Sequence, residues 1–124
     1  MNGTNAILDS NIIIYLSKGI LHEKILLEKY QRFYVSIITY IEVLGYKFQS
    51  NEEKSLVERL FDKFEIIPID MNIATIAIEI RQQKKIKLPD ALILATAKKF
   101  NADLITNNIA DFENIEDSIS IIKP

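Results

Sequence analysis

Short apolar segments alternate with longer segments of helical periodicity, and this alternation restricts the fold more than any other feature of the sequence. The apolar segments are rich in Ile, Leu and Val, which favours strands at residues 6–8, 33–35, 66–69, 103–106 and 119–122. Strands that are joined through helices pair in parallel, because antiparallel neighbours need only a tight turn. The sequence therefore predicts an α/β fold of three layers, α/β/α, around a mostly parallel sheet of about five short strands.

Helices are predicted where apolar residues recur at helical spacing, at residues 10–17, 22–31, 39–48, 52–64, 72–84 and 90–100. The last of these segments is apolar on nearly every side, so we expect it to be buried. Pro68 indicates that the third strand lies at an edge of the sheet or ends nearby. The sequence of 124 residues has no repeat or low-complexity linker, which favours a single domain over residues 1–124.

The composition excludes several kinds of site. The chain has no Cys, which rules out disulfides, thiolate zinc sites and Cys nucleophiles. Its single histidine, His22, lies in the second predicted helix, and we expect a structural role for it. The formal net charge is −2, so binding of nucleic acid requires a local basic patch.

Neither a signal peptide nor a membrane span is predicted. The first apolar stretch, residues 6–21, is interrupted by polar residues and has no basic segment before it. No run approaches the roughly 18 apolar residues that a membrane helix needs. We therefore expect a cytoplasmic protein that has no membrane partner.

Four carboxylates stand beside predicted strand ends or helix starts, at Asp9, Glu42, Asp90 and Asp111. Each has a structural explanation. Asp9 and Asp90 suit helix N-caps, Glu42 completes the pattern of a capping box that begins at Thr39, and Asp111 suits a turn or a cap.

The four carboxylates together favour a shared site. In a parallel sheet, the ends of strands and the first turns of the helices that follow them meet at one rim. Carboxylates at one rim repel one another and have perturbed pKa values unless a cation lies among them. Ligands that are all oxygen atoms suit Mg²⁺ or Mn²⁺, and such ions serve phosphoryl chemistry.

Four segments surround these residues. They read Leu-Asp-Ser-Asn-Ile at 8–12, Ser-Ile-Ile-Thr-Tyr-Ile-Glu-Val at 36–43, Leu-Pro-Asp-Ala-Leu-Ile-Leu-Ala-Thr-Ala at 88–97 and Leu-Ile-Thr-Asn-Asn-Ile-Ala-Asp-Phe at 104–112. In this order and at this spacing they resemble the four successive motifs of the PIN domain, and more narrowly those of VapC-type toxins of bacterial toxin–antitoxin pairs. The resemblance spans nearly the whole chain.

The resemblance implies a metal-dependent endoribonuclease, in which Asp9, Glu42 and Asp90 hold Mg²⁺ or Mn²⁺ and a metal-activated water hydrolyses RNA phosphodiesters. Asp111 is the candidate for a fourth catalytic and metal-binding acid, because asparagines occupy the nearer positions of the last motif. Supporting roles around the metal fall to Asn11, Thr39, Thr106 and Asn108. The resemblance also implies a homodimer and a small antitoxin partner, and we expect the antitoxin on apolar surface of the 22–31 and 52–64 helices.

Basic residues near Asp90 are the candidates for RNA binding. Arg81, Lys84, Lys85 and Lys87 precede Asp90, and a basic flank there would guide phosphates to the rim, with residues 84–87 the better candidates. Lys98 and Lys99 follow Asp90 in sequence and are weaker candidates. A merely solubilising surface is the alternative for all of these residues.

Two other classes of function stay open. A phosphatase of the haloacid dehalogenase type needs a second Asp two residues after the first, and Asn11 occupies that position. A non-catalytic module could keep the fold to bind RNA or protein, and it would be favoured if one of the three main carboxylates were missing. All three are present.

Overall fold

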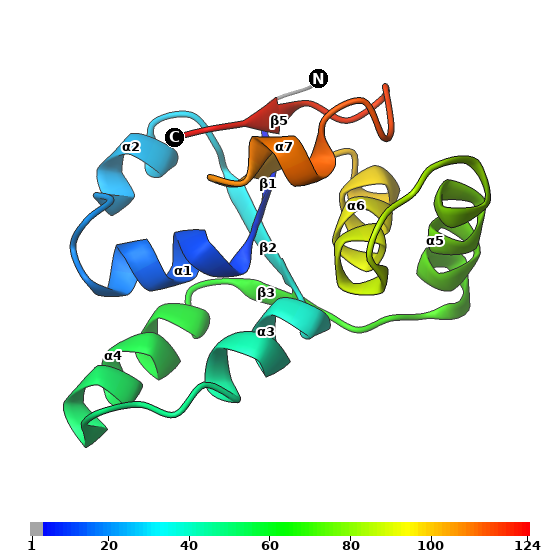
Figure 1. Ribbon diagram of the computed structural model, residues 1–124. Coiled ribbons are helices and arrows are strands. Elements are labelled where there is room, and N and C mark those ends of the chain that lie inside the picture. Colours follow the sequence, from blue (N-terminus) through cyan, green and yellow to red (C-terminus); the bar gives the residue numbers. More distant parts are fainter. Residues whose placement is uncertain (1–3) are drawn as a thin grey trace.

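A five-stranded sheet forms the centre of the protein, whose computed structural model describes residues 4–124 (Figure 1). The strands are β1 (Asn5–Leu8), β2 (Arg32–Ser36), β3 (Glu65–Ile67), β4 (Asp103–Ile105) and β5 (Ile121–Ile122). Their order is β3-β2-β1-β4-β5, and every pairing is parallel. The predicted parallel α/β fold is confirmed. β3 is an edge strand that ends directly before Pro68, so both expectations for this proline hold.

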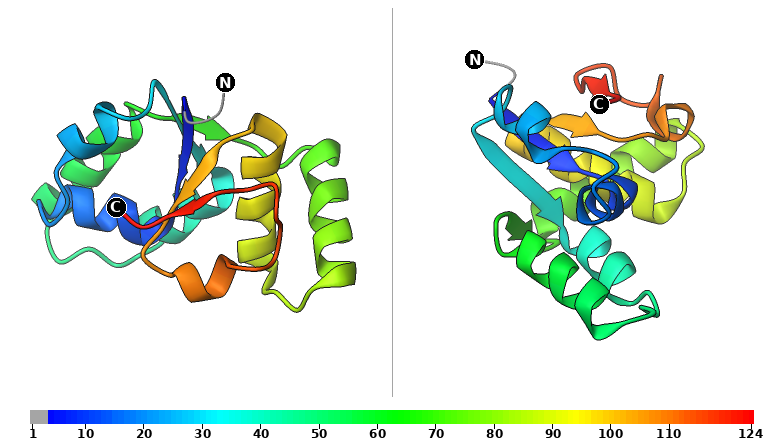
Figure 2. Two further views of the ribbon diagram at one scale, coloured as in Figure 1. Left: turned by 90° about the horizontal axis from the view of Figure 1, so that it is seen from above. Right: turned by 90° about the vertical axis from the view of Figure 1, so that its left-hand side faces the viewer.

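Helices cover both faces of the sheet (Figures 1 and 2). They are α1 (Ser10–Ser17), α2 (Glu23–Leu27), α3 (Ile37–Leu44), α4 (Asn51–Phe61), α5 (Met71–Gln83), α6 (Leu88–Phe100) and α7 (Ile109–Phe112). Alternate residues of a strand point to opposite faces. Ile7 accordingly belongs to the core under α5 and α6, whereas Ala6 and Leu8 belong to the core under α1 and α4. One core thus lies on each face of the sheet, between the sheet and a layer of helices, which gives the predicted α/β/α arrangement of three layers.

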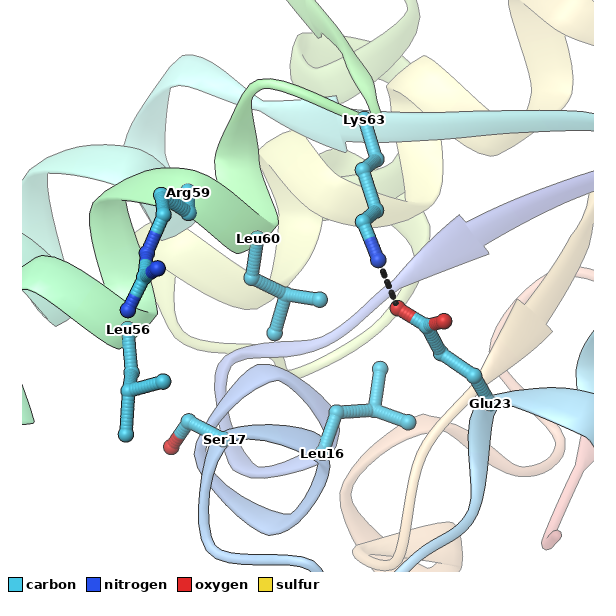
Figure 3. A pocket seen from close by; sticks show the side chains of 7 residues that line it. All are labelled: Leu16, Ser17, Glu23, Leu56, Arg59, Leu60 and Lys63. Atoms are coloured by element: carbon cyan, nitrogen blue, oxygen red, sulfur yellow. Dashed lines mark hydrogen bonds and ion pairs between the residues drawn. The ribbon is translucent and has the colours of Figure 1, made fainter.

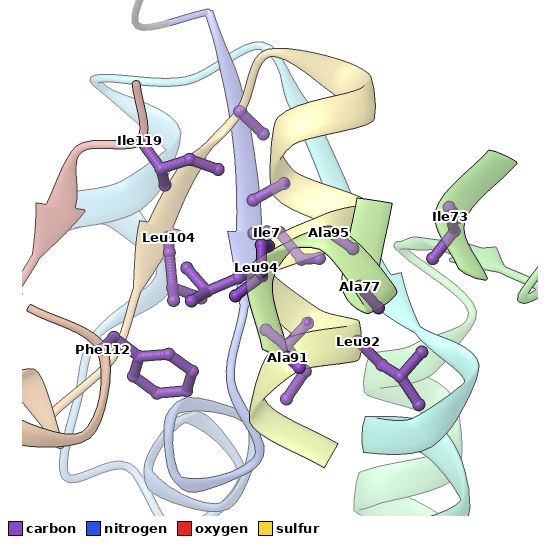
Figure 4. Packing of buried hydrophobic residues seen from close by; sticks show 14 of the residues in the cluster. Ile7, Ile73, Ala77, Ala91, Leu92, Leu94, Ala95, Leu104, Phe112 and Ile119 are labelled. Carbon is purple, nitrogen blue, oxygen red and sulfur yellow. The ribbon is translucent and has the colours of Figure 1, made fainter. Parts of the chain in front are cut away.

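Helix α6 is the most deeply buried helix of the described chain. Its residues 91–97 are all buried, as the apolar pattern predicts. Figure 4 shows Leu94 of α6 beside Ile7 and Leu104 of the sheet, with the Phe112 ring of α7 close by. This packing fixes the start of α6, which carries Asp90, relative to the ends of β1 and β4.

Several helix boundaries differ from the predictions, each for a local reason. α2 ends at Leu27 because the N–H groups of Gln31 and Arg32 bond to the Thr4 carbonyl, which draws this segment into the sheet. α3 ends at Leu44, directly before its C-cap Gly45, because glycine is a poor helix former. Helix starts are also displaced, and they bear on the site below.

None of the helices within residues 4–124 is long and apolar enough to cross a membrane.

Substitution of Leu94 by Ala tests the importance of the α6 core. Leu94 is fully buried, so Leu94→Ala should lower the free energy of unfolding by about 3 kcal/mol. Leu88→Ala is the control, because Leu88 lies on the same helix with 52% of its surface exposed, and it should change the value by less than about 0.5 kcal/mol. Urea unfolding measures both. Equal losses would show that α6 is not held by this core.

Candidate active site

The order of the strands reverses between β1 and β4. From β1 the chain builds β2 and β3 on one side and then crosses back through α5 and α6 to place β4 on the other side. In open parallel sheets, sites form at such a switch point, beyond the carboxyl ends of the strands. Asp9 follows β1 there, and Thr106 follows β4.

Asp9 is buried and held by two hydrogen bonds. The Ser10 N–H donates to its Oδ1 atom at 2.8 Å, and the Thr106 hydroxyl donates to its Oδ2 atom at 2.8 Å. Asp9 also caps α1, as predicted. Since each carboxylate oxygen accepts more than one bond, both oxygens keep capacity for a further ligand. The cap and a role in the site are therefore compatible.

Two loops join behind Asp9 into one unit. The Asn108 N–H donates to the Thr106 hydroxyl at 3.0 Å, and the Asn107 N–H donates to the Asn11 Oδ1 atom at 3.3 Å. Three of the residues expected to support the site, Asn11, Thr106 and Asn108, thus connect the segment after β1 with the segment after β4. Their contacts orient Asp9 and the last motif relative to each other.

Glu42 and Thr39 do not form a capping box, so that interpretation is wrong. α3 begins at Ile37, and its cap is Ser36, whose hydroxyl accepts from the Ile38 N–H at 3.1 Å. Glu42 therefore lies in the second turn, where it is exposed. Thr39 is fully buried one turn before it, and its hydroxyl has no hydrogen-bond partner among the described residues. No hydrogen bond links Thr39 to Asp9 within residues 4–124.

Asp90 is not an N-cap either. α6 begins at Leu88 with Lys87 as its cap, because Pro89 is tolerated in a first turn, where an N–H has no partner within the helix. Asp90 is the third residue of the helix and is half-buried. Asp111, predicted to lie in a loop, belongs to the short helix α7, is exposed, and does not cap it.

The pKa shifts of Asp90 and Glu42 indicate that the four carboxylates lie near one another. Burial raises the pKa of Asp90 to about 6, and the charges of Asp111, Asp9 and Glu42 add to the effect, while Lys87 opposes it. Partial burial and the Asp9 charge also raise the pKa of Glu42. Because such effects require proximity, these carboxylates share one negatively charged rim.

A cleft opens beside Asp90 and Asp111. It has a volume of about 540 Å³ and is lined by Arg81, Lys85, Ile86, Lys87, Asp90, Ala110, Asp111 and Ile115. Lys85 and Lys87 of the predicted RNA-binding set thus face the site, and Lys84 does not line the cleft. Arg81 joins them from the last turn of α5, and the basic cluster of the sequence was the only signal that pointed to it.

Lys98 and Lys99 lie elsewhere. They occupy the opposite end of α6, about 12 Å along its axis from Asp90. Lys98 pairs with Glu116 at 2.8 Å, and Lys99 pairs with Asp70. The expectation that they flank the rim is wrong. His22 is exposed and caps α2 through its Nδ1 atom, in agreement with a structural role.

A family model for the PIN domain matches residues 6–117. The chain belongs to the PIN domain family. Three solved structures illustrate the similarity. A toxin–antitoxin complex from Klebsiella pneumoniae is 34% identical with a TM-score of 0.77, and the match covers 92% of this chain and 94% of that chain.

VapBC-1 from nontypeable Haemophilus influenzae is 27% identical, with a TM-score of 0.72 and coverage of 95% and 96%. DNA-bound VapBC from Salmonella typhimurium is 23% identical, with a TM-score of 0.80 and coverage of 98% of both chains. A comparison with curated protein sequences found no match. The expected resemblance to the PIN domain, and to VapC toxins of VapBC systems among solved structures, is confirmed.

The donor set of this PIN domain fits a hard divalent cation. No three His, Cys, Asp or Glu side chains within residues 4–124 are arranged to hold a metal ion by themselves. Mg²⁺ does not require such a cage, since it keeps several water ligands and binds through one or two carboxylates. The oxygen-only donors and the raised pKa of Asp90 match a rim that a cation would neutralise.

Asp90→Asn should stabilise the metal-free PIN domain at neutral pH. The folded-state pKa of about 6 lies above the ordinary value of 3.8, so stability falls as the pH rises between these values. Removing this charge should raise Tm at pH 7.5 by about 3 °C after allowance for solvent screening, and by nothing at pH 4, where the carboxyl is neutral.

Thermal unfolding in EDTA measures this effect. Asp117→Asn, at an exposed carboxylate, serves as the control and should shift Tm by less than about 1 °C. A lower Tm for Asp90→Asn at pH 7.5 would show that the charge of Asp90 is compensated within the protein.

Proposed function

We propose that this PIN domain is the toxin of a toxin–antitoxin pair and cleaves RNA as a Mg²⁺- or Mn²⁺-dependent endoribonuclease. The observation that carries the proposal is the set of four carboxylates at the rim: burial of Asp90 and repulsion from Asp111, Asp9 and Glu42 raise the pKa of Asp90 to about 6. Membership of the PIN family and similarity to a protein in a toxin–antitoxin complex support it. The family match leaves the phosphatase-type alternative without support.

In this proposal, Asp9, Glu42, Asp90 and Asp111 would surround the cation, one or two of them as direct ligands and the others through the water molecules that the cation keeps. When bound, the cation supplies activation of water and neutralisation of charge at the scissile phosphate. Asp9 is the most rigid of the four, because Ser10 and Thr106 fix both of its oxygens. Asp90 must lose its proton to act as a ligand, so the affinity for the cation should fall as the pH drops below about 6.

The remaining polar residues keep the reacting groups in place. Thr106 holds Asp9, and its hydroxyl in turn accepts the Asn108 N–H. The Asn108 side chain makes no capping bond to α7 and is exposed at the rim, where it can contact a phosphate or a water molecule. Lys85 and Lys87, which line the cleft, would attract the RNA backbone by charge, whereas Lys84 lies outside the cleft.

Cleavage of RNA by purified protein tests the proposal. Wild-type protein should cut structured RNA with Mg²⁺ or Mn²⁺ and stop in EDTA. Asp9→Asn and Asp90→Asn should each reduce the rate by roughly 100-fold or more, because each weakens binding of a cation that stabilises the transition state by several kcal/mol. Asp117→Asn should cleave at the wild-type rate. If folded Asp9→Asn and Asp90→Asn proteins cleave RNA at the wild-type rate, the cleavage comes from a contaminating nuclease and the proposal is refuted.

We also propose that the antitoxin binds the groove between α1, α2 and α4. Figure 3 shows the groove, which has a volume of about 320 Å³ and apolar walls from Leu16, Leu56 and Leu60. An ion pair of 2.8 Å between Lys63 and Glu23 crosses one side. Leu56 in the groove and Leu27 of α2 keep 48% and 60% of their surfaces exposed. Folding of this chain therefore leaves apolar surface here that a partner could cover.

Leu56→Asp should weaken capture of the antitoxin by roughly tenfold or more, because it places a charge in the apolar groove. The control is Ile78→Asp, since Ile78 of α5 is also exposed, at 56%, and lies outside the groove. Co-purification with the small protein encoded beside this gene measures both. Capture that survives Leu56→Asp would count against this surface, and size-exclusion chromatography tests the expected homodimer.

A further inference from the structure

The cleft beside Asp90 and Asp111 is lined by cationic and by apolar side chains, neither of which a metal site requires. One wall comes from the last turn of α5 and residues 85–87, and it carries Arg81, Lys85 and Lys87. The opposite wall comes from α7 and the segment after it, with Ala110 and Ile115. A volume of about 540 Å³ lies within the range of sites that bind small molecules.

The cations of the cleft are available to a ligand. All three are exposed, and none of them forms an ion pair within residues 4–124. The charge of Lys87 acts on the Asp90 carboxylate, which places Lys87 at the catalytic end of the cleft. Lys85 and Arg81 continue the positive wall. An RNA strand bound at Asp90 would therefore have Lys87 beside it, and the part of the strand that extends along the cleft would face Lys85 and Arg81.

The lining offers little that distinguishes one base from another. Bases of single-stranded RNA are recognised by hydrogen bonds to their edges and by stacking on aromatic rings or on Arg guanidinium planes, and stacking tolerates any base. The described residues that line the cleft include no aromatic ring, amide or hydroxyl side chain. They offer charge for phosphates and the aliphatic surfaces of Ile86 and Ile115, which accept any base or ribose.

We propose that this cleft binds the RNA backbone next to the scissile bond, with Arg81 and Lys85 on successive phosphates, and that it does so without base preference. The proposal rests on the proposed ribonuclease function of the adjoining rim. It assigns Lys85 to the cleft and leaves its sequence neighbour Lys84 outside, a distinction that sequence alone does not make.

Three matched variants test the cleft. Arg81→Gln, Lys85→Gln and Lys84→Gln each remove one positive charge from an exposed position of the same segment. They are compared in the Asp9→Asn background, so that binding of a fluorescein-labelled, single-stranded RNA of mixed sequence is measured without cleavage. Thermal unfolding verifies that all of them are folded.

Arg81→Gln and Lys85→Gln should each weaken RNA binding about fivefold to tenfold near 0.1 M salt, and each should reduce the slope of log affinity against log salt by about 1. Lys84→Gln should change affinity less than about twofold. The loss for Lys85→Gln should be equal with homopolymers of U, A and C. An equal loss for Lys84→Gln and Lys85→Gln would overturn the proposal in favour of a diffuse surface charge. A loss confined to one homopolymer would overturn the absence of base preference.

Cleavage kinetics separate this proposal from the proposed function. In the otherwise wild-type enzyme, Lys85→Gln should raise KM and leave kcat nearly unchanged. If wild-type protein cleaves RNA and Lys85→Gln matches it in KM, the cleft proposal fails while the ribonuclease stands. If wild-type protein does not cleave, yet Lys85→Gln still weakens RNA binding and Lys84→Gln does not, the ribonuclease fails while the cleft stands.

Discussion

Repulsion among carboxylates that the fold holds at one rim is the constraint on which the other features of this site depend. Carboxylates in solution avoid one another, so their convergence needs a rigid support. Two cores supply it, one on each face of the sheet. The buried helix α6 fixes Asp90, and the end of β1 fixes Asp9. The stability gained in these cores offsets the electrostatic cost at the rim.

The hydrogen bond from Thr106 to Asp9 turns this general convergence into a defined geometry. It joins two residues that are 97 positions apart in sequence and that follow the neighbouring strands β4 and β1. The Asn107 and Asn108 N–H groups extend the connection to Asn11 and back to Thr106. Negative charge at the rim and positive charge along the adjoining cleft then stand side by side. A cation and a phosphodiester backbone are complementary to this arrangement.

The sequence predicts the features that follow from local patterns. Alternation of strands and helices predicts the parallel sheet, and the apolar pattern of residues 90–100 predicts the burial of α6. Asp9 is recognisable because its strand, cap and helix are contiguous. Considered singly, Glu42, Asp90 and Asp111 are explained equally well as caps or turns, and it is their common place beside strand ends, together with the family motifs, that favours a site.

Local patterns do not predict which of two suitable residues caps a helix, or which of two neighbouring side chains lines a cleft. Thr39 and Ser36 both suit a cap, and tertiary packing selected Ser36 and buried Thr39. Lys84 and Lys85 are equivalent in sequence, and only the path of the chain between α5 and α6 turns Lys85 into the cleft. Lys98 lies close to Asp90 in sequence, but the length of α6 separates them and Glu116 pairs with Lys98.

Proton release on metal binding tests the central claim most directly. If Asp90 has a pKa of about 6 and becomes a ligand, Mn²⁺ binding at pH 6 should release about half a proton per ion, and almost none at pH 8. Titration calorimetry in two buffers of different ionisation enthalpy measures this number. The account predicts release at pH 6 that disappears in Asp90→Asn. Mn²⁺ that fails to bind, or that binds with no proton release at pH 6, would contradict it.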